Sequence, residues 1–109
     1  MILYYYIKME IKTLIELDNC VQNYKYVLVD FYAIWCGPCK VLSKMLEEFQ
    51  KEYPHLLIVK VNVDNAPELS EKYDISSLPT IKLFVNYHEK LTLMGSSQKN
   101  LDEIAKFIV

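Results

Sequence analysis

The spacing of apolar side chains changes along the chain, and the apolar runs predict five strands. Residues 7–12 alternate apolar and charged side chains, which is the period of a half-buried strand. Residues 26–33 and 56–63 are nearly unbroken apolar runs, typical of strands buried on both faces. Residues 80–85 and 90–94 predict two further strands that form a hairpin at the end of the sheet.

Helical spacing of apolar side chains marks four other segments. They are residues 14–23, 36–53, 66–73 and 98–109. Thr13 is placed to cap the first helix and Asn65 to cap the third, which has Pro67 in its first turn. Strands that alternate with helices indicate an α/β fold with helices on both faces of the sheet, and the closing hairpin makes that sheet mixed.

Length and charge narrow the class of protein. At 109 residues the chain is one domain (1–109), with residues 1–6 as an N-terminal extension. The net charge of −2, with every basic residue a lysine, argues against a nucleic-acid partner. No apolar run approaches the roughly 20 residues that span a membrane. The opening residues lack the basic start and cleavage site of a secretory signal, so we expect a cytoplasmic protein, or an organellar one if a targeting segment has been removed.

Two of the three cysteines, Cys36 and Cys39, form a C-x-x-C between an apolar strand and a helix. At a helix N-terminus, free N–H groups and the helix dipole stabilise a thiolate, so Cys36 is the expected nucleophile. Cys39, one turn along, can attack a mixed disulfide formed on Cys36. A zinc half-site, a fixed structural disulfide and a pair of inert thiols are alternatives. No second pair at ligand spacing accompanies the motif, so no metal is expected.

The sequence around these cysteines resembles the thioredoxin family. The resemblance rests on VDFYAIWCGPCK (29–40), VKVNVD (59–64), SLPTIKLF (77–84) and Gly95, and it extends over residues 7–109. It implies a five-stranded mixed sheet flanked by four helices and a redox-active Cys36/Cys39 pair. It also implies a monomer without bound cofactor that takes electrons from NADPH through a thioredoxin reductase and reduces protein disulfides, for example those of peroxiredoxins.

Two charged residues lie inside the apolar strands. A carboxylate at Asp30 is costly to bury, and its pKa should be raised by desolvation. The position alone is also compatible with a structural aspartate, but Asp30 matches the buried aspartate of the family, and the resemblance implies that it takes the proton of Cys39. For Lys60 we leave two interpretations open: a partner that tunes Asp30, or an outward-facing, solvated lysine.

The resemblance also implies a shallow substrate groove beside the cysteines. A proline before a strand is ordinarily trans and merely begins the strand, whereas the family resemblance implies that Pro79 is cis and packs against the cysteines. The backbone of Leu78 would then be free to pair with an extended substrate. The apolar floor would be formed by Trp35, Gly37, Pro38, Leu78 and Gly95. For Trp35 the alternative is a place in the ordinary core, and for Gly95 a simple turn.

Several positions depart from the family pattern. Lys44 stands where many members have a proline, and Tyr32 where an indole is common. Tyr87 lies in the hairpin turn where glycine often follows asparagine, so we expect a turn without positive φ at Tyr87. Cys20, on the first helix, is interpreted as a buried bystander, with a regulatory second thiol as the alternative.

These observations favour a protein-disulfide reductase. The Gly-Pro between the cysteines offers no imidazole to stabilise the Cys36 thiolate, and a stable thiolate favours oxidants. Two alternatives stay open: an oxidase or isomerase of a folding compartment, and a non-catalytic binding subunit with the same fold.

Overall fold

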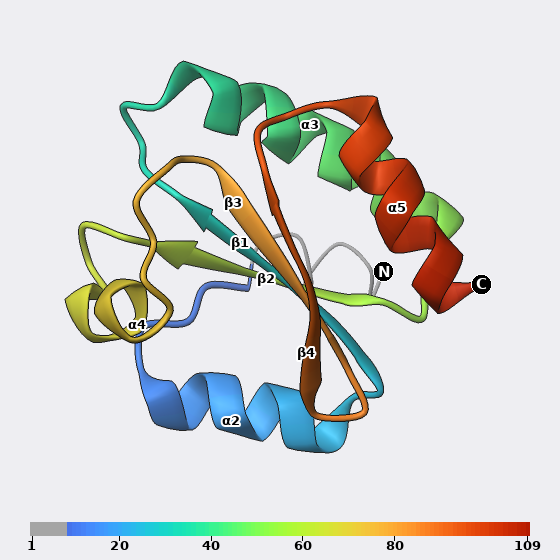
Figure 1. Cartoon of the computed structure of the whole chain (residues 1–109), viewed down its shortest axis with the longest axis horizontal. Helices are drawn as coiled ribbons and strands as arrows, with labels where there is room; N and C mark the ends of the chain where they lie inside the picture. The colour runs from blue at the N-terminus through green and yellow to red at the C-terminus, as the bar shows by residue number, and fades with distance from the viewer. Residues whose placement is uncertain (1–8) are drawn as a thin grey trace.

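The computed structural model describes residues 9–109, and Figure 1 shows how its elements are arranged. The expected extension at residues 1–6 and the beginning of the expected strand at 7–12 lie outside the described residues. Within residues 9–109, no helix has the length and apolar character needed to cross a membrane.

In the described part of the chain, residues 9–109, four strands form one mixed sheet in the order β2-β1-β3-β4. They are β1 (Tyr26–Tyr32), β2 (Leu57–Asn62), β3 (Thr80–Val85) and β4 (His88–Met94). β1 pairs in parallel with β2 and antiparallel with β3, and β3 and β4 form an antiparallel hairpin. Because β1 and β2 are parallel, the loops that follow them leave the same edge of the sheet, which brings segments distant in sequence together there.

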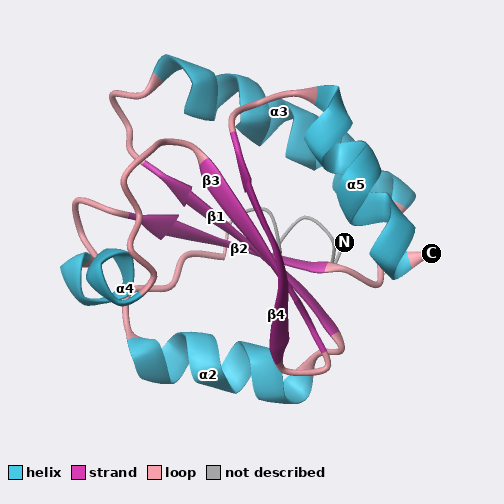
Figure 2. Cartoon of the chain, viewed as in Figure 1, coloured by secondary structure: helices cyan, strands magenta, loops and turns pink. Residues whose placement is uncertain are grey.

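The helices cover both faces of this sheet, as the alternation of elements predicts (Figure 2). They are α2 (Leu14–Asn23), α3 (Gly37–Glu52), α4 (Pro67–Lys72) and α5 (Gln98–Ile108). α2 and α4 lie on one face, and α3 and α5 on the other. The expected α/β architecture is therefore confirmed.

Each face of the sheet has its own apolar core, and the alternation of side chains along β1 decides which residue belongs to which. Val27, Val29 and Phe31 pack with the residues of α2 and α4, whereas Leu28 packs with α3 and α5. Asp30 has the same parity as Leu28, so its side chain lies on the α3 face, under the helix that carries the cysteines.

The fifth strand expected at residues 7–12 is not formed by the described part of that segment. Glu10 makes an isolated parallel bridge to Lys60, flanked by hydrogen bonds between Ile11 N–H and Lys60 O and between Lys60 N–H and Met9 O, each 2.9 Å. The backbone then leaves β2 because the N–H groups of Lys12 and Thr13 both donate to the Glu16 carboxylate in the capping box of α2. The pairing with β2 is therefore limited to one bridge in residues 9–12.

The cap predicted for α4 is shifted by one residue. Ala66, not Asn65, is the N-cap, because the N–H of Ser70 closes the first turn on the Ala66 carbonyl at 3.1 Å. Asn65 belongs to the preceding turn, where its N–H donates to Asn62 O.

The hairpin turn differs from the expectation. Asn86 and Tyr87 both have positive φ, 49° and 79°, the signs of a type I′ turn. A two-residue loop needs this handedness to follow the twist of the strands, and that requirement outweighs the preference of Tyr87 for negative φ. The Tyr87 hydroxyl donates to Asp18 of α2 at 3.0 Å, which holds the side chain against the helix. β4 consequently begins at His88, two residues earlier than expected.

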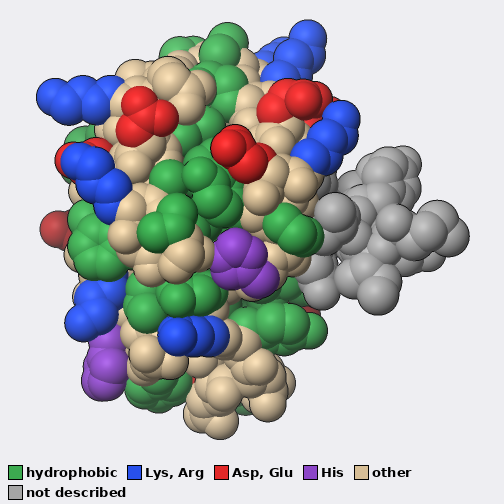
Figure 3. Space-filling model, turned by 90° about the vertical axis from the view of Figure 1, so that its right-hand side faces the viewer, with side chains coloured by type: hydrophobic (Ala, Val, Ile, Leu, Met, Phe, Trp, Pro, Cys, Tyr) green, Lys and Arg blue, Asp and Glu red, His purple; other side chains and the backbone are tan. Residues whose placement is uncertain are grey.

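The face of the molecule that carries α5 and the end of α3 has charges of both signs. Lysine and acidic side chains are interspersed there around apolar side chains (Figure 3). This face lies on the right in Figure 1, whereas the loop between β1 and α3 lies on the left.

Candidate active site

The two cysteines of the C-x-x-C are joined in a disulfide where β1 passes into α3. The S–S distance is 2.25 Å, and the Cα atoms are 5.3 Å apart. Cys36 is the N-cap of α3, and its Sγ accepts a hydrogen bond from the N–H of Cys39 at 3.2 Å. The sulfur therefore lies at the helix N-terminus, where the sequence places it and where a thiolate is stabilised after reduction. Both residues are buried.

A cavity of about 450 Å³ opens beside Cys36. Its lining residues are Trp35, Cys36, Gly37, Pro38, Val63, Ile75, Ser76 and Leu78. The peptide bond between Leu78 and Pro79 is cis, as the resemblance implies. Pro79 is buried behind this wall, and Gly95 donates its N–H to the Pro79 carbonyl at 2.9 Å. Gly95 has φ of 92°, so it is a turn residue that contacts Pro79 but does not line the cavity.

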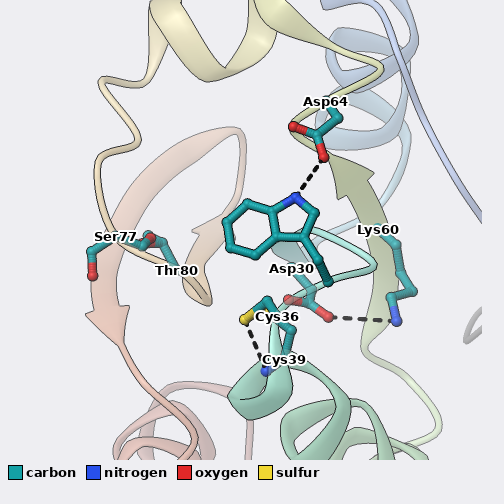
Figure 4. Close-up of a disulfide and its surroundings, with 8 residues drawn as sticks. Asp30, Cys36, Cys39, Lys60, Asp64, Ser77 and Thr80 are labelled. Carbon is teal, nitrogen blue, oxygen red and sulfur yellow. Dashed lines mark hydrogen bonds and ion pairs between the residues drawn. A yellow bond between two sulfur atoms is a disulfide. The ribbon is translucent and has the colours of Figure 1, made fainter.

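Trp35 is 70% exposed, which excludes the alternative of an ordinary core residue. Its indole N–H donates to the Asp64 carboxylate at 2.9 Å (Figure 4). Asp64 follows β2, whereas Trp35 follows β1, so the parallel pairing of the two strands brings them together. The Asp64 N–H in turn donates to the Asn62 side chain at 3.0 Å. The ring is thus held by Asp64 at the wall of the cavity that Cys36 also lines.

Asp30 has no exposed surface, and Figure 4 shows its carboxyl group near Cys36. Neither carboxyl oxygen accepts a hydrogen bond from residues 9–109, and the Lys60 ammonium is 3.8 Å from Oδ2 (Figure 4). Burial raises the pKa of Asp30 to about 6, and the positive charge of Lys60 limits the rise. Lys60 is paired with Asp30 in the register of β1 and β2, and its side chain is 16% exposed. Of the two interpretations left open, the structure selects the one in which Lys60 faces Asp30.

The Lys60 ammonium has two further neighbours. It donates to Ser43 Oγ of α3 at 3.1 Å and lies 4.5 Å from the centre of the Tyr32 ring. The Tyr32 hydroxyl donates to the Glu10 carboxylate. A second opening, of about 210 Å³, lies at this point; we call it the Lys60 pocket. It is lined by Tyr32, Ala33, Ile34, Cys39, Lys40, Ser43 and Lys60.

Cys20 is half-buried on α2 and remains a free thiol. Burial and the nearby Glu16 carboxylate raise its pKa, so the thiolate is disfavoured there. The described residues include no cluster of three or more metal-ligating side chains.

A comparison with protein-family models matches the thioredoxin model to residues 8–109 of this chain. The chain belongs to the thioredoxin family. It is similar to thioredoxin-1 of Saccharomyces cerevisiae, with 39% identity over 88 residues that cover 81% of this chain and 85% of the yeast protein. Among solved structures, Plasmodium falciparum thioredoxin superposes with a TM-score of 0.85 and 34% identity, covering 93% of this chain and 99% of that one.

A third match comes from a structural study of thiol resolution in yeast mitochondrial 1-Cys peroxiredoxin by the glutathione and thioredoxin systems. That chain has a TM-score of 0.82 and 26% identity, and the match covers 92% of each chain. Thioredoxins are protein-disulfide oxidoreductases that bind no cofactor, exchange electrons with disulfide-containing proteins and are served by reductase partners. The disulfide between Cys36 and Cys39 is therefore the redox-active centre of this thioredoxin, not a fixed structural bridge.

The structure of this thioredoxin gathers most of the residues that the sequence singles out. Cys36, Cys39, Asp30 and Lys60 lie together, and four of the groove residues line one cavity. Asp64 and Ser43 were not among the site residues predicted from the sequence. An acidic residue at the carboxyl end of β2 and a serine four residues after Cys39, on the same helix face, are signals that could have found them.

Proposed function

We propose that this thioredoxin works as a reductase of protein disulfides, receiving its electrons from NADPH through a thioredoxin reductase. The observation that carries the proposal is the position of Cys36 Sγ, at the N-terminus of α3 and on the wall of the apolar cavity. A thiolate there is stabilised by helix N–H groups but has no imidazole between the cysteines to stabilise it further, which favours a reductant over an oxidant.

Reduction of a target proceeds by two exchanges. The Cys36 thiolate attacks one sulfur of the target disulfide, which forms a mixed disulfide and releases the other target sulfur as a thiolate. Cys39 loses its proton to Asp30, and its thiolate attacks Cys36 Sγ. This step forms the Cys36–Cys39 disulfide and releases the second target sulfur. Two electrons have then passed from the cysteine pair to the target, and a reductase returns them.

The cavity wall would hold the target in place. The backbone of Leu78, freed by the cis bond before Pro79, is available to pair with an extended segment, as in strand addition. Trp35, fixed by Asp64, supplies an exposed apolar surface next to Cys36. Gly37 and Pro38 complete the wall around the reacting sulfur.

We further propose that the partners include a peroxiredoxin and a thioredoxin reductase, and that the protein acts as a monomer in the cytoplasm. The similarity to the chain from the peroxiredoxin study supports the first partner. The monomer is an expectation taken from the resemblance to the thioredoxin family. A free thiol at Cys20, in the same chain as an exchanging cysteine pair, fits a reducing compartment. Cell fractionation and pull-down with a Cys39→Ser trap test these assignments.

The deciding experiment measures the redox potential of the Cys36/Cys39 pair in glutathione and dithiothreitol buffers, read by thiol alkylation and mass shift. We expect a value near the roughly −270 mV known for thioredoxin. A value above about −200 mV would support an oxidase or isomerase instead. If the Cys36/Cys39 pair did not cycle between dithiol and disulfide and function were retained after Cys36→Ser, the protein would be a non-catalytic binding subunit.

A further inference from the structure

The ammonium of Lys60 is held at the meeting point of three elements. Lys60 extends from β2, its hydrogen-bond acceptor Ser43 belongs to α3, and Asp30 belongs to β1. The 3.1 Å contact with Ser43 is a hydrogen bond, whereas the 3.8 Å separation from Asp30 is an ion pair without one. Ser43 is therefore the group that fixes where the positive charge lies relative to the carboxylate.

A lysine needs such an anchor at this place. Its side chain has many rotamers, its ammonium is strongly hydrated, and the Lys60 pocket gives it a way toward solvent. Ser43 lies four residues after Cys39, so the two side chains share one face of α3 and both line the pocket. The hydroxyl thus holds the ammonium on the side where Cys39 and Asp30 exchange the proton.

Tyr32 closes the other side of the ammonium. Its ring centre is 4.5 Å from Lys60 Nζ, which is cation–π distance. The ring is oriented by the bond from its hydroxyl to Glu10, and Glu10 is bridged to the backbone of Lys60 itself. The charged and titratable groups around Asp30 and Lys60 are Tyr32 and Glu10, together with Cys39 and Lys40 of α3. β3 places the apolar Ile81 opposite Asp30.

We propose that Ser43 and Tyr32 are positioning residues for the resolving step: they hold the Lys60 ammonium beside Asp30 and thereby set the proton affinity of that carboxyl when Cys39 is deprotonated. The inference rests on the proposed function for its place in the reaction. The position of the Lys60 ammonium relative to Asp30 can be tested without measuring any catalytic turnover.

The test is an NMR titration of the Asp30 carboxyl carbon in the oxidised protein, where neither cysteine of the pair titrates. In Ser43→Ala the ammonium is free to move into the Lys60 pocket, so Asp30 loses part of the charge that lowers its pKa. We expect its midpoint to rise by about 0.5 pH unit. Ser43→Thr keeps the hydroxyl and should leave the midpoint within about 0.2 unit of the parent.

Lys60→Met supplies the matched background. There, Ser43→Ala should produce no further shift, because the charge it positions is gone. An unchanged or lowered midpoint in Ser43→Ala, or a shift that persists with Lys60→Met, would overturn the assignment of Ser43. Dispersed amide spectra identify the variants that are folded. If the alanine variant is not, Ser43→Val, which has the shape of the threonine variant without its hydroxyl, replaces it and should show the same upward shift.

The role of the Tyr32 ring in holding the Lys60 ammonium is tested separately. Tyr32→Phe keeps the aromatic face, whereas Tyr32→Leu removes it, so the midpoint should rise more in Tyr32→Leu. Equal midpoints in the two variants would remove Tyr32 from the proposal.

In the resolving step, the pH midpoint for release of a mixed disulfide should follow the Asp30 midpoint upward in Ser43→Ala. A protein that fails as a reductase but shows the titration shifts would lose the proposed function and keep the positioning. An active reductase without these shifts would lose the positioning alone.

Discussion

At the scale of single residues, the chemistry depends on where burial and charge place two ionisable groups. Asp30 is enclosed because it shares the strand parity of Leu28 and has α3 above it. Its raised pKa, to about 6, makes it able to accept a proton near neutral pH, which an exposed aspartate does poorly. The pKa of the Cys20 thiol is raised as well, but Cys20 lies on α2, outside the cavity that Cys36 lines. The raised pKa suits Asp30 to the proposed proton transfer, whereas the raised pKa of Cys20 disfavours its thiolate.

Asp30→Asn should slow the resolving step by roughly 10- to 100-fold at pH 7, because no carboxylate remains to take the Cys39 proton. The measurement is the release of a preformed mixed disulfide on Cys36, followed by rapid quench. Asp102→Asn, an exposed change on α5, is the matched control and should keep the parent rate. A rate for Asp30→Asn equal to that of the control would exclude Asp30 as the base.

Cys20 should be a slow thiol in the folded protein. In a Cys36→Ser/Cys39→Ser background, where it is the only thiol left, iodoacetamide at pH 7.4 should alkylate it several-fold more slowly than in urea. The reason is that burial raises its pKa and limits access. Equal rates in the two conditions would instead support a reactive regulatory thiol.

At the scale of elements, long patterns of apolar spacing predict most helices and strands correctly, and local contacts explain where the prediction fails. The helices and strands of residues 9–109 follow from apolar spacing over five or more residues. Residues 7–12 have the alternating pattern of a strand, so the pattern predicts one. The pairing ends because two backbone N–H groups, those of Lys12 and Thr13, donate to the Glu16 carboxylate instead of to β2, and the alternation does not show this. The sign of φ at Tyr87 follows from the twist of β3 and β4, not from the preference of tyrosine.

Tyr87→Gly should be more stable to urea than Tyr87→Ala by about 1 kcal/mol. Both variants lose the hydroxyl bond to Asp18, but only glycine adopts the positive φ of this turn without a Cβ clash. Circular dichroism in urea measures the difference. If the alanine variant were as stable as the glycine variant, the turn would not impose a left-handed conformation at residue 87.

At the scale of the whole molecule, the two-faced sheet assembles the site from distant parts of the chain. The C-x-x-C and its helix could be read from the sequence because the motif is local. The bond from Trp35 to Asp64, the contact of Lys60 with Ser43 and that of Tyr32 with Glu10 join residues 17 to 29 positions apart. Such contacts depend on strand order and register, which a single sequence does not state, and for this reason the roles of Lys60 and Trp35 stayed open until the fold was known.

The pH dependence of the free energy of unfolding is a property of the whole molecule, because ionisable groups on several elements contribute to it. Asp30 has a folded pKa of about 6, above its unfolded value, so the folded state holds a proton that the unfolded state has released between about pH 4 and 6. Across that interval stability should fall by roughly 2–3 kcal/mol as pH rises.

Two glutamates act in the opposite direction. Hydrogen bonds from the Lys12 and Thr13 backbone lower the pKa of Glu16. Burial raises the pKa of Glu89, but the bonds from Lys82 and Thr92 outweigh it and lower the pKa. Their stabilisation is present above about pH 4.5 and is lost as pH falls further.

The free energy of unfolding should therefore be highest near pH 4–5. Urea titrations across pH 3–8 measure it. In Asp30→Asn the decline between pH 4 and 6 should vanish while the loss at acidic pH remains. A parent protein whose stability is flat from pH 4 to 7 would contradict the raised pKa of Asp30.

The exposed indole of Trp35 has a practical consequence. It is the only tryptophan in the chain and it directly precedes Cys36 in the sequence, so all indole emission originates beside the disulfide. Disulfides quench the fluorescence of nearby indoles, and opening this one changes the light that the protein emits. The chain thus carries its own optical sensor of oxidation state, and its exchange with a tryptophan-free partner can be followed in a stopped-flow cell without any attached dye.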